Sequence, residues 1–229
     1  VRGRELGLPF PGTPGRWNAI TDVAGVEVGQ MTLISGEGPL RVGHGPVRTG
    51  VTAILPRGKA KAHVPCAAGY YSLNGNGEMT GVVWFEESGE LQTPITITNT
   101  HSCGVTRDAT IRWLVGRGVG TGQDWGLPVA AETYDGDLND INGFHVTAEH
   151  TVAALDSACT GPVAMGSVGG GTGMIAYEFK AGTGTASRRV TVGDETYTVG
   201  VLVQANHGKR QWFNVLGQPV GRLMPFEGL

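Results

Sequence analysis

The clearest strand in this sequence is TYTVGVLVQA, residues 196–205, which ends immediately before Asn206. Valine, threonine and tyrosine are favoured in strands because their branched or flat side chains pack well on a pleated surface. The apolar residues at its centre follow one another without polar alternation, a pattern typical of a strand buried on both faces. We therefore predict that these residues form an internal strand of a sheet.

Further segments rich in β-branched and apolar residues predict the other strands, at residues 26–34, 51–55, 81–85, 94–99, 128–131, 173–179 and 188–192. Partial helical spacing of apolar residues predicts a helix over residues 105–117, with Gly118 as its C-cap. Thr147 is a candidate N-cap for a second helix over residues 147–155. Three prolines in residues 9–14 exclude a helix there and predict an extended arm. The sum predicts a layered α/β (α+β) domain.

The composition is that of a globular protein. At about 100–200 residues per domain, a chain of this length allows one large domain. Of the 229 residues, 40% are hydrophobic and 16% are charged, and 39 are glycine. This glycine content is well above the average of about 7% and has no collagen-like period, so it predicts tight turns and close backbone approaches. We treat residues 1–229 as a single domain.

Charge and cysteine content exclude several classes of protein. The formal net charge of −3 gives no electrostatic footprint for nucleic acid. No stretch approaches the roughly 18 apolar residues that a membrane span needs, so no membrane partner is predicted. Cys66, Cys103 and Cys159 are odd in number and far apart, which is typical of a reducing compartment rather than a disulfide framework. We expect a cytoplasmic location, or the periplasm if a signal peptide has been removed.

Two motifs resemble ligand-binding loops, but each lacks a feature that such a loop requires. Residues 135–140, DGDLND, open like a calcium loop, but the sixth position is Asp140 and the twelfth is Val146, where glycine and glutamate are required. An acidic turn at a strand end is the better interpretation. Residues 169–173, GGGTG, resemble a phosphate loop, but an apolar strand follows where a helix is required. Close backbone packing is the better interpretation here.

No cofactor is predicted. The six histidines lack the spacing of a zinc peptidase, and no metal, nucleotide or flavin is implied. His101-Ser102-Cys103 contains a thiol beside an imidazole. Because a buried cysteine is usually structural, we do not favour a thiol nucleophile.

Two regions carry candidate site residues. The loop NGNGEMTG, residues 74–81, contains two Asn-Gly steps, which predict positive φ angles and exposed amides. It is either a plain hairpin turn or a site loop that includes Asn74, Asn76 and Glu78. Asn206 follows the strongest strand, where a side-chain amide can either donate to an oxyanion or simply end the strand.

Glu132 and Tyr134 follow the strand at residues 128–131. Their i, i+2 spacing predicts that both lie on one face of the strand. A carboxylate on a pocket wall can hold a substrate ammonium group. The alternative is a surface glutamate beside an ordinary tyrosine.

Taken together, several stretches resemble one family: residues 15–26, 72–81, 98–102, 132–136, 168–174 and 204–208. They closely resemble the α subunit of the L-aminopeptidase/D-alanyl-esterase-amidase family, which includes the β-peptidyl aminopeptidases. The resemblance implies a four-layer αββα sandwich, similar to N-terminal-nucleophile (Ntn) hydrolases but with different connectivity. It also implies a precursor that cleaves itself before a serine.

In such a family the freed serine becomes the first residue of a β chain. Its hydroxyl is the nucleophile, and its own α-amine, with a pKa of about 7.7–8, can act as the base. The nucleophile is therefore expected on a partner chain from the same precursor, and the resemblance does not define the cleavage junction after Leu229. The resemblance further implies an oligomer of αβ pairs, a tetramer of heterodimers.

The resemblance also implies roles for particular residues. Asn206 corresponds to the oxyanion-hole amide, Glu132 to the acid that holds the free amine, and Tyr134 to a hydrogen-bonding neighbour of the reacting centre. Trp125 corresponds to a wall of the side-chain pocket, and the loop of Asn74, Asn76 and Glu78 is a weaker candidate. The expected function is release of N-terminal residues from peptides, amides or esters that carry a free amine. The alternatives are a non-catalytic relative and an amidase for nylon-type oligomers.

Overall fold

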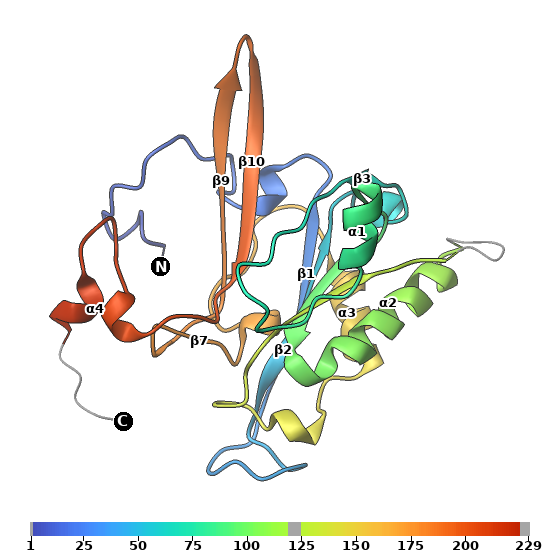
Figure 1. The fold of residues 1–229 in the computed structure, drawn as a ribbon, viewed down its shortest axis with the longest axis vertical. Coiled ribbons are helices and arrows are strands. Elements are labelled where there is room, and N and C mark those ends of the chain that lie inside the picture. Colours follow the sequence, from blue (N-terminus) through green and yellow to red (C-terminus); the bar gives the residue numbers. More distant parts are fainter. Residues whose placement is uncertain (1, 119–124, 225–229) are drawn as a thin grey trace.

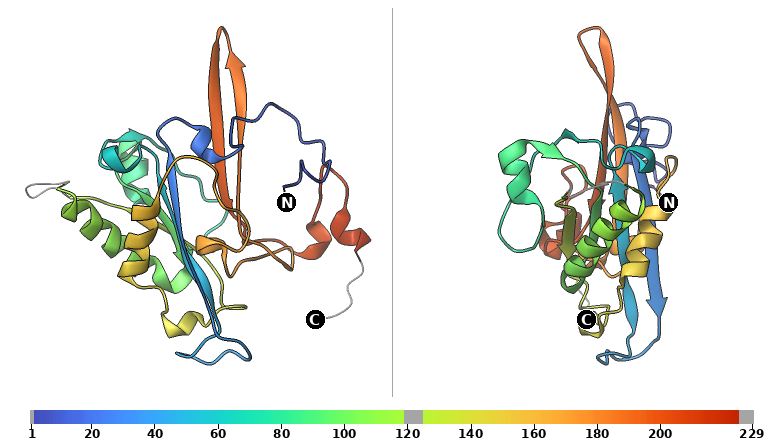
Figure 2. Two further views of the ribbon diagram at one scale, coloured as in Figure 1. Left: turned by 180° about the vertical axis from the view of Figure 1, so that it is seen from behind. Right: turned by 90° about the vertical axis from the view of Figure 1, so that its right-hand side faces the viewer.

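The computed structural model describes residues 2–118 and 125–224. Its centre is a four-stranded sheet with the order β1-β2-β5-β6. Helices α2 and α3 cover one face of this sheet, and the hairpin β9–β10 lies on the other side (Figures 1 and 2). The central strands are β1 (Glu27–Ser35), β2 (Val47–Leu55), β5 (Ile95–Asn99) and β6 (Val129–Thr133).

The remaining elements are shorter or lie outside this sheet. The helices are α1 (Val82–Ser88), α2 (Cys103–Gly116), α3 (Ala148–Ser157) and α4 (Val220–Leu223). Single 3-10 turns are η1 (Ile20–Asp22), η2 (Lys59–Lys61), η3 (Thr100–Ser102), η4 (Ile141–Gly143), η5 (Gly169–Gly171) and η6 (Arg210–Trp212). The other strands are β3 (Cys66–Ala67), β4 (Glu90–Leu91), β7 (Ile175–Ala176), β8 (Phe179–Lys180), β9 (Thr183–Val192) and β10 (Glu195–Gln204).

The central sheet is buried on both faces. β1 and β2 pair antiparallel along their whole length, β2 pairs antiparallel with β5, and β5 pairs parallel with β6. On the helical face, Val51, Leu55, Trp113 and Leu155 belong to one apolar cluster. On the other face, a second cluster gathers around Val28 and Ile54, with Leu202 of the hairpin packed against it. The sheet is therefore an internal layer of the molecule.

One close contact joins α3 to the sheet. Gly29 of β1 lies so close to α3 that a methyl group on it would overlap the carbonyl oxygen of Ala154. A backbone atom cannot move aside without shifting the helix. Glycine at this position is what allows the helix to pack against β1.

Gly29→Ala is expected to lower the free energy of unfolding by about 1–3 kcal/mol or more, since overpacking of a close contact has a cost of that order. Denaturant titration measures the change. Gly184→Ala is the matched control, because Gly184 is also in a strand but a Cβ there would meet nothing within 4 Å. A control variant as unstable as Gly29→Ala would contradict the steric explanation.

Both predicted helices are confirmed. α2 spans Cys103–Gly116 with Arg117 as its C-cap, and Gly118 follows with a φ of 72°. α3 begins after Thr147, whose backbone N–H donates to His150 Nδ1 at 3.0 Å. The strands predicted at residues 26–34, 51–55, 94–99, 128–131 and 188–192 are also present within β1, β2, β5, β6 and β9, with shifted ends.

The strand prediction for residues 81–85 is wrong, since they lie in helix α1 or at its N-cap. Gly89 ends the helix in the left-handed conformation, with its N–H bonded to Phe85 O at 2.8 Å. Phe85 is buried whereas Val83 is 77% exposed. A short apolar run does not distinguish a single helical face from a strand.

The strand predicted over residues 173–179 is a tight hairpin instead. β7 and β8 are two residues each, and the two residues between them, Tyr177 and Glu178, have φ angles of 52° and 64°. Such turns normally carry asparagine or glycine. Tyrosine and glutamate gave no signal of the turn in the sequence.

Residues 196–205 do form a strand, β10, but the predicted burial on both faces is wrong. Among the described strands, β10 pairs only with β9, and the hairpin extends beyond the rest of the described structure (Figures 1 and 2). Alternate residues Tyr197, Val199, Val201 and Val203 are each about half exposed. The other face, at Gly200, packs against Ile20 of η1. One apolar face of β10, formed by Tyr197, Val199, Val201 and Val203, is therefore not covered by other described residues.

Candidate functional site

The candidate site lies where β5 and β6 end. The two strands are parallel, so their carboxyl ends meet at one edge of the sheet. This is the edge at which sheets of parallel strands place their sites. Thr98 pairs with Glu132 in the parallel register, and η3 follows β5 directly.

Glu132 is half-buried at this edge. Its Oε2 accepts a hydrogen bond from Thr100 Oγ1 at 2.5 Å. Its Oε1 faces Gly77, on which a Cβ would lie 2.8 Å away. Within residues 2–118 and 125–224, no lysine, arginine or histidine forms an ion pair with this carboxylate. The hydrogen bond from Thr100 holds the Glu132 carboxylate in place, and no cationic side chain of the described residues neutralises its negative charge.

The Asn-Gly loop lies directly against Glu132. Glu132 N–H donates to Glu78 O at 3.2 Å, Thr80 N–H donates to Ala130 O at 3.0 Å, and Met79 forms a bridge with Ala131. Residues 78–80 therefore run antiparallel beside β6. The loop is not a plain hairpin turn, because it brings its end to a candidate site residue.

The conformation expected for this loop is wrong in one respect. None of residues 74–77 has a positive φ angle. The chain turns instead through a side-chain bond, in which Asn76 N–H donates to Asn74 Oδ1 at 2.9 Å. Asparagine can mimic a backbone turn in this way, so the two Asn-Gly steps do not need the left-handed conformation, which this loop adopts at Gly81, with a φ of 79°.

Cys103, the first residue of α2, is buried and lies within the electrostatic influence of Glu78 and Glu132. Burial raises the pKa of its thiol to about 12, and the nearby charges of Glu78 and Glu132 contribute to the rise. The thiolate is the nucleophilic form of cysteine. At neutral pH this thiol is protonated, which agrees with the interpretation of Cys103 as structural.

The side chain of Asn206 connects three segments of the chain. Its Oδ1 accepts from Tyr134 N–H at 3.0 Å, and its Nδ2 donates to Tyr134 O at 3.0 Å and to Ile175 O at 3.2 Å. The ends of β10 and β6 and the start of β7 are thereby joined. Both hydrogens of the amide are used within this chain.

Tyr134 presents its ring to the surface, where it is 51% exposed. The ring lies against Gly136, on which a methyl group would overlap the phenolic oxygen. The backbone of Tyr134 is held by Asn206, so the structure brings Glu132, Tyr134 and Asn206 to the same end of β6.

The structure does not bring Trp125 to this group. Trp125 precedes β6, whereas Tyr134 follows it, so the two residues flank opposite ends of the strand. Its ring is 62% exposed and meets Trp84 edge-on, with centroids 5.0 Å apart. Asp124, the preceding residue, lies outside the described residues.

The acidic turn after β6 is an internal structural feature. Asp135, Asn139 and Asp140 are almost fully buried. Asn139 Nδ2 donates to Asp135 Oδ1 at 3.0 Å, and Asp140 Oδ2 accepts from Gly43 N–H at 2.7 Å. Burial raises the pKa of Asp135, while the His145 ring and backbone amides lower that of Asp140.

The glycine run of η5 packs closely against the sheet, as predicted. Gly169 N–H donates to Thr32 Oγ1 at 2.8 Å, and Gly170 N–H donates to Thr52 Oγ1 at 3.1 Å. The amides that a phosphate would need are therefore bonded to threonine hydroxyls. Across the described part of the chain, no three His, Cys, Asp or Glu residues are grouped as metal ligands, and no helix is long and apolar enough to cross a membrane.

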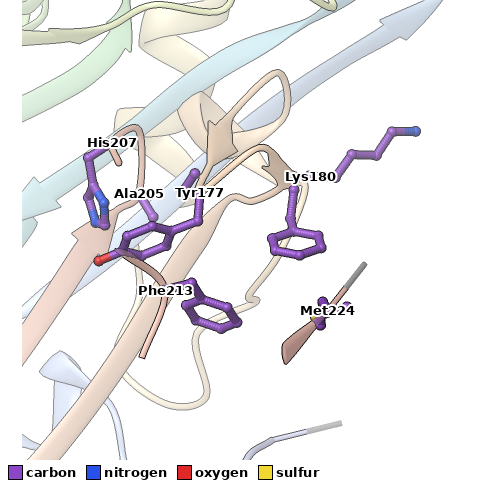
Figure 3. Close-up of a pocket in the computed structure, with 8 residues that line it drawn as sticks. Tyr177, Lys180, Ala205, His207, Phe213 and Met224 are labelled. Atoms are coloured by element: carbon purple, nitrogen blue, oxygen red, sulfur yellow. The ribbon is translucent and has the colours of Figure 1, made fainter. Parts of the chain in front are cut away.

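Two structural features near the site were not predicted from the sequence. One is Thr100, whose only signal was its place directly after a predicted strand. The other is an apolar cavity of about 370 Å³, whose lining includes Ala205 and His207, the sequence neighbours of Asn206 (Figure 3). It is lined by Ala176, Tyr177, Phe179, Lys180, Ala205, His207, Phe213 and Met224. These residues come from separate stretches of sequence, and no local pattern links them.

Comparison with solved structures defines the class of protein. The chain matches the L-aminopeptidase D-Ala-esterase/amidase of Ochrobactrum anthropi, a prototype serine aminopeptidase and a variant of the Ntn hydrolase fold, with a TM-score of 0.93 and 52% identity over 98% of this chain and 63% of that one. A Burkholderia sp. β-aminopeptidase matches with a TM-score of 0.91 and 52% identity over 98% of this chain and 62% of that one. The fold is therefore a mixed α/β fold of the Ntn-hydrolase kind, as expected.

The model of peptidase family S58 matches residues 18–227, and the chain belongs to this family. It is 60% identical over 220 residues to the β-peptidyl aminopeptidase BapA of Sphingosinicella microcystinivorans, covering 96% of this chain and 55% of that protein. The protein of the same name from Sphingosinicella xenopeptidilytica is 52% identical, again with 55% of its length covered. The chain thus spans little more than half the length of these relatives.

Proposed function

We propose that this chain is the larger, N-terminal part of a self-processed serine aminopeptidase that removes N-terminal residues from substrates with a free amine. The observation that carries the proposal is the unneutralised Glu132 carboxylate, fixed at the same sheet edge as Asn206 in a chain of family S58. A carboxylate is the natural receptor for an ammonium group, and an amide N–H is a natural oxyanion donor.

In this proposal the substrate ammonium binds Glu132, which places the adjacent carbonyl near Asn206. A serine hydroxyl from the partner β chain attacks that carbonyl, with the α-amine of the same serine as the base. Asn206 Nδ2 then stabilises the oxyanion. Because both of its hydrogens are bonded in this chain, the longer bond, to Ile175 O at 3.2 Å, is the one that opens for the oxyanion.

The exposed apolar face of the β9–β10 hairpin supports the proposal of a partner chain. Val192, Tyr197, Val199, Val201 and Val203 are on one face of the hairpin and remain about half exposed or more. A contiguous exposed apolar surface marks an interaction site. We propose that the β chain covers this face and that αβ pairs assemble further, as a tetramer of heterodimers. Trp125 stays a proposed wall of the side-chain pocket, and its ring packs edge-on against Trp84 before the start of β6.

Val201→Lys is expected to abolish most of the β-chain binding, because an ammonium group would be buried without a partner. Co-purification of the two processed chains under native conditions measures the effect. Thr191→Lys is the matched control, since Thr191 pairs with Thr196 on the opposite face of the hairpin. Equal loss of the β chain in both variants, or in neither, would contradict this docking face.

The direct test is intact-mass measurement of the protein expressed from its full gene, with N-terminal sequencing of every chain. The expected result is a second chain that begins with serine and is stoichiometric with the first. That protein is expected to hydrolyse a free-amine anilide and to reject its N-acetyl derivative. A single uncut chain without hydrolysis would overturn the proposal.

A further inference from the structure

The carboxylate of Glu132 is held by a residue with no assigned role. Thr100 is the first residue of η3, directly after β5, and its hydroxyl donates to Glu132 Oε2 at 2.5 Å. One oxygen of the carboxylate is thereby occupied. The second oxygen, Oε1, faces the open backbone of Gly77.

The backbone that carries Thr100 is itself fixed. Asn99, which is 3% exposed, accepts His101 N–H on its Oδ1 at 3.1 Å. Its Nδ2 donates to Thr49 Oγ1 of β2 at 3.0 Å. Two hydrogen bonds of the buried Asn99 side chain thus link η3 to the sheet, and the Thr100 hydroxyl has a defined place.

Thr100 fixes the carboxylate without neutralising it. A lysine or arginine at this place would hold Oε2 equally well but would cancel the charge. A neutral hydroxyl leaves the full charge available to an incoming cation. Glu78 lies opposite Glu132 in the antiparallel pairing of residues 78–80 with β6. Because both side chains are acidic, the electrostatic field at this place also favours a cation.

We propose that Thr100 is a positioning residue for amine recognition, and that it holds Glu132 so that Oε1 meets the primary ammonium group of the substrate. Gly77 sets the space in front of Oε1, since any larger residue would place a Cβ 2.8 Å from this oxygen. A glutamate side chain that is already ordered loses less conformational entropy on binding. This inference rests on the proposed function, because it names how the same site selects its substrate.

The alternative is that the Thr100 hydroxyl only closes the end of β5. That role would alter stability and leave amine affinity unchanged. Three variants separate the two roles. Thr100→Val keeps the shape and removes the donor, Thr100→Ser keeps the donor, and Gly77→Ala crowds Oε1 while leaving the Thr100 bond in place.

The experiment uses the processed protein from the full gene. KM and kcat are measured with β-alanine 4-nitroanilide, and binding of benzylamine is measured by calorimetry with benzyl alcohol as the neutral control. Loss of a hydrogen bond to a charged group weakens binding about tenfold or more. We expect that increase in KM and in the benzylamine Kd for Thr100→Val and Gly77→Ala, with kcat within about twofold of wild type.

Thr100→Ser is expected to restore benzylamine affinity to within about threefold, as the donor is retained. Equal affinity in Thr100→Val and wild type would overturn the inference, as would a serine variant as weak as the valine variant. A wild-type protein that does not bind benzylamine would overturn it too. Benzylamine binding that depends on Thr100 without any anilide hydrolysis would uphold the inference and count against the proposed aminopeptidase activity alone.

Discussion

Replacing Asn206 with alanine is expected to lower kcat by about 100- to 1000-fold, the usual effect of removing one oxyanion donor. The expected loss has a structural basis at the end of β6, where the Asn206 amide lies between Tyr134 O and Ile175 O. Self-cleavage of the precursor is expected to slow as well, because it passes through the same kind of oxyanion. Steady-state kinetics and the fraction of uncut precursor measure the two effects.

A structural loss must be separated from a catalytic one, because Asn206 also joins the ends of three strands. Asn206→Asp is the matched variant: it keeps an oxygen that can accept the Tyr134 N–H but has no N–H of its own. We expect it to lose at least as much kcat as the alanine variant. If kcat and self-cleavage both stay within about twofold in Asn206→Ala, far below the effect of a lost donor, the oxyanion assignment is wrong.

Replacing Glu132 with glutamine is expected to raise KM for free-amine substrates about tenfold or more, since a charged hydrogen bond is lost. The amide keeps the size of the carboxylate and can still accept the Thr100 hydroxyl, so the change is one of charge. Discrimination against the N-acetylated substrate is expected to fall in parallel. Comparison of KM for β-alanine 4-nitroanilide and its acetyl derivative measures both.

Glu78→Gln is the control for Glu132→Gln. The two acids pair across the strands, but Glu78 is exposed and accepts no hydrogen bond from Thr100. We expect a smaller increase in KM for this variant, because exposed charges are screened by solvent. Unchanged KM and unchanged rejection of the acetylated substrate in Glu132→Gln would remove Glu132 from the amine site.

Several parts of this site were predictable because they depend on local chemistry. Asn206, Glu132 and Tyr134 were expected at strand ends, and they lie there. Thr100 was not expected as a contact of Glu132, since the two residues are 32 positions apart. Only the parallel pairing of β5 with β6 brings them together. The apolar cavity was missed for the same reason, because its walls come from separate stretches.

Most of the strands, both long helices and the family were predictable from the amino-acid sequence, because strand propensity, helix capping and long motifs are local properties of the chain. Which faces of these elements are covered depends on long-range packing. The sequence pattern of residues 196–205 predicts a buried strand, yet among the described strands β10 pairs with β9 alone and keeps one apolar face exposed. The same long-range packing makes residues 82–85 helical and places the Asn-Gly loop against Glu132. Burial and long-range pairing depend on which segments meet in space, and an apolar run is the same in sequence whether or not a partner covers it.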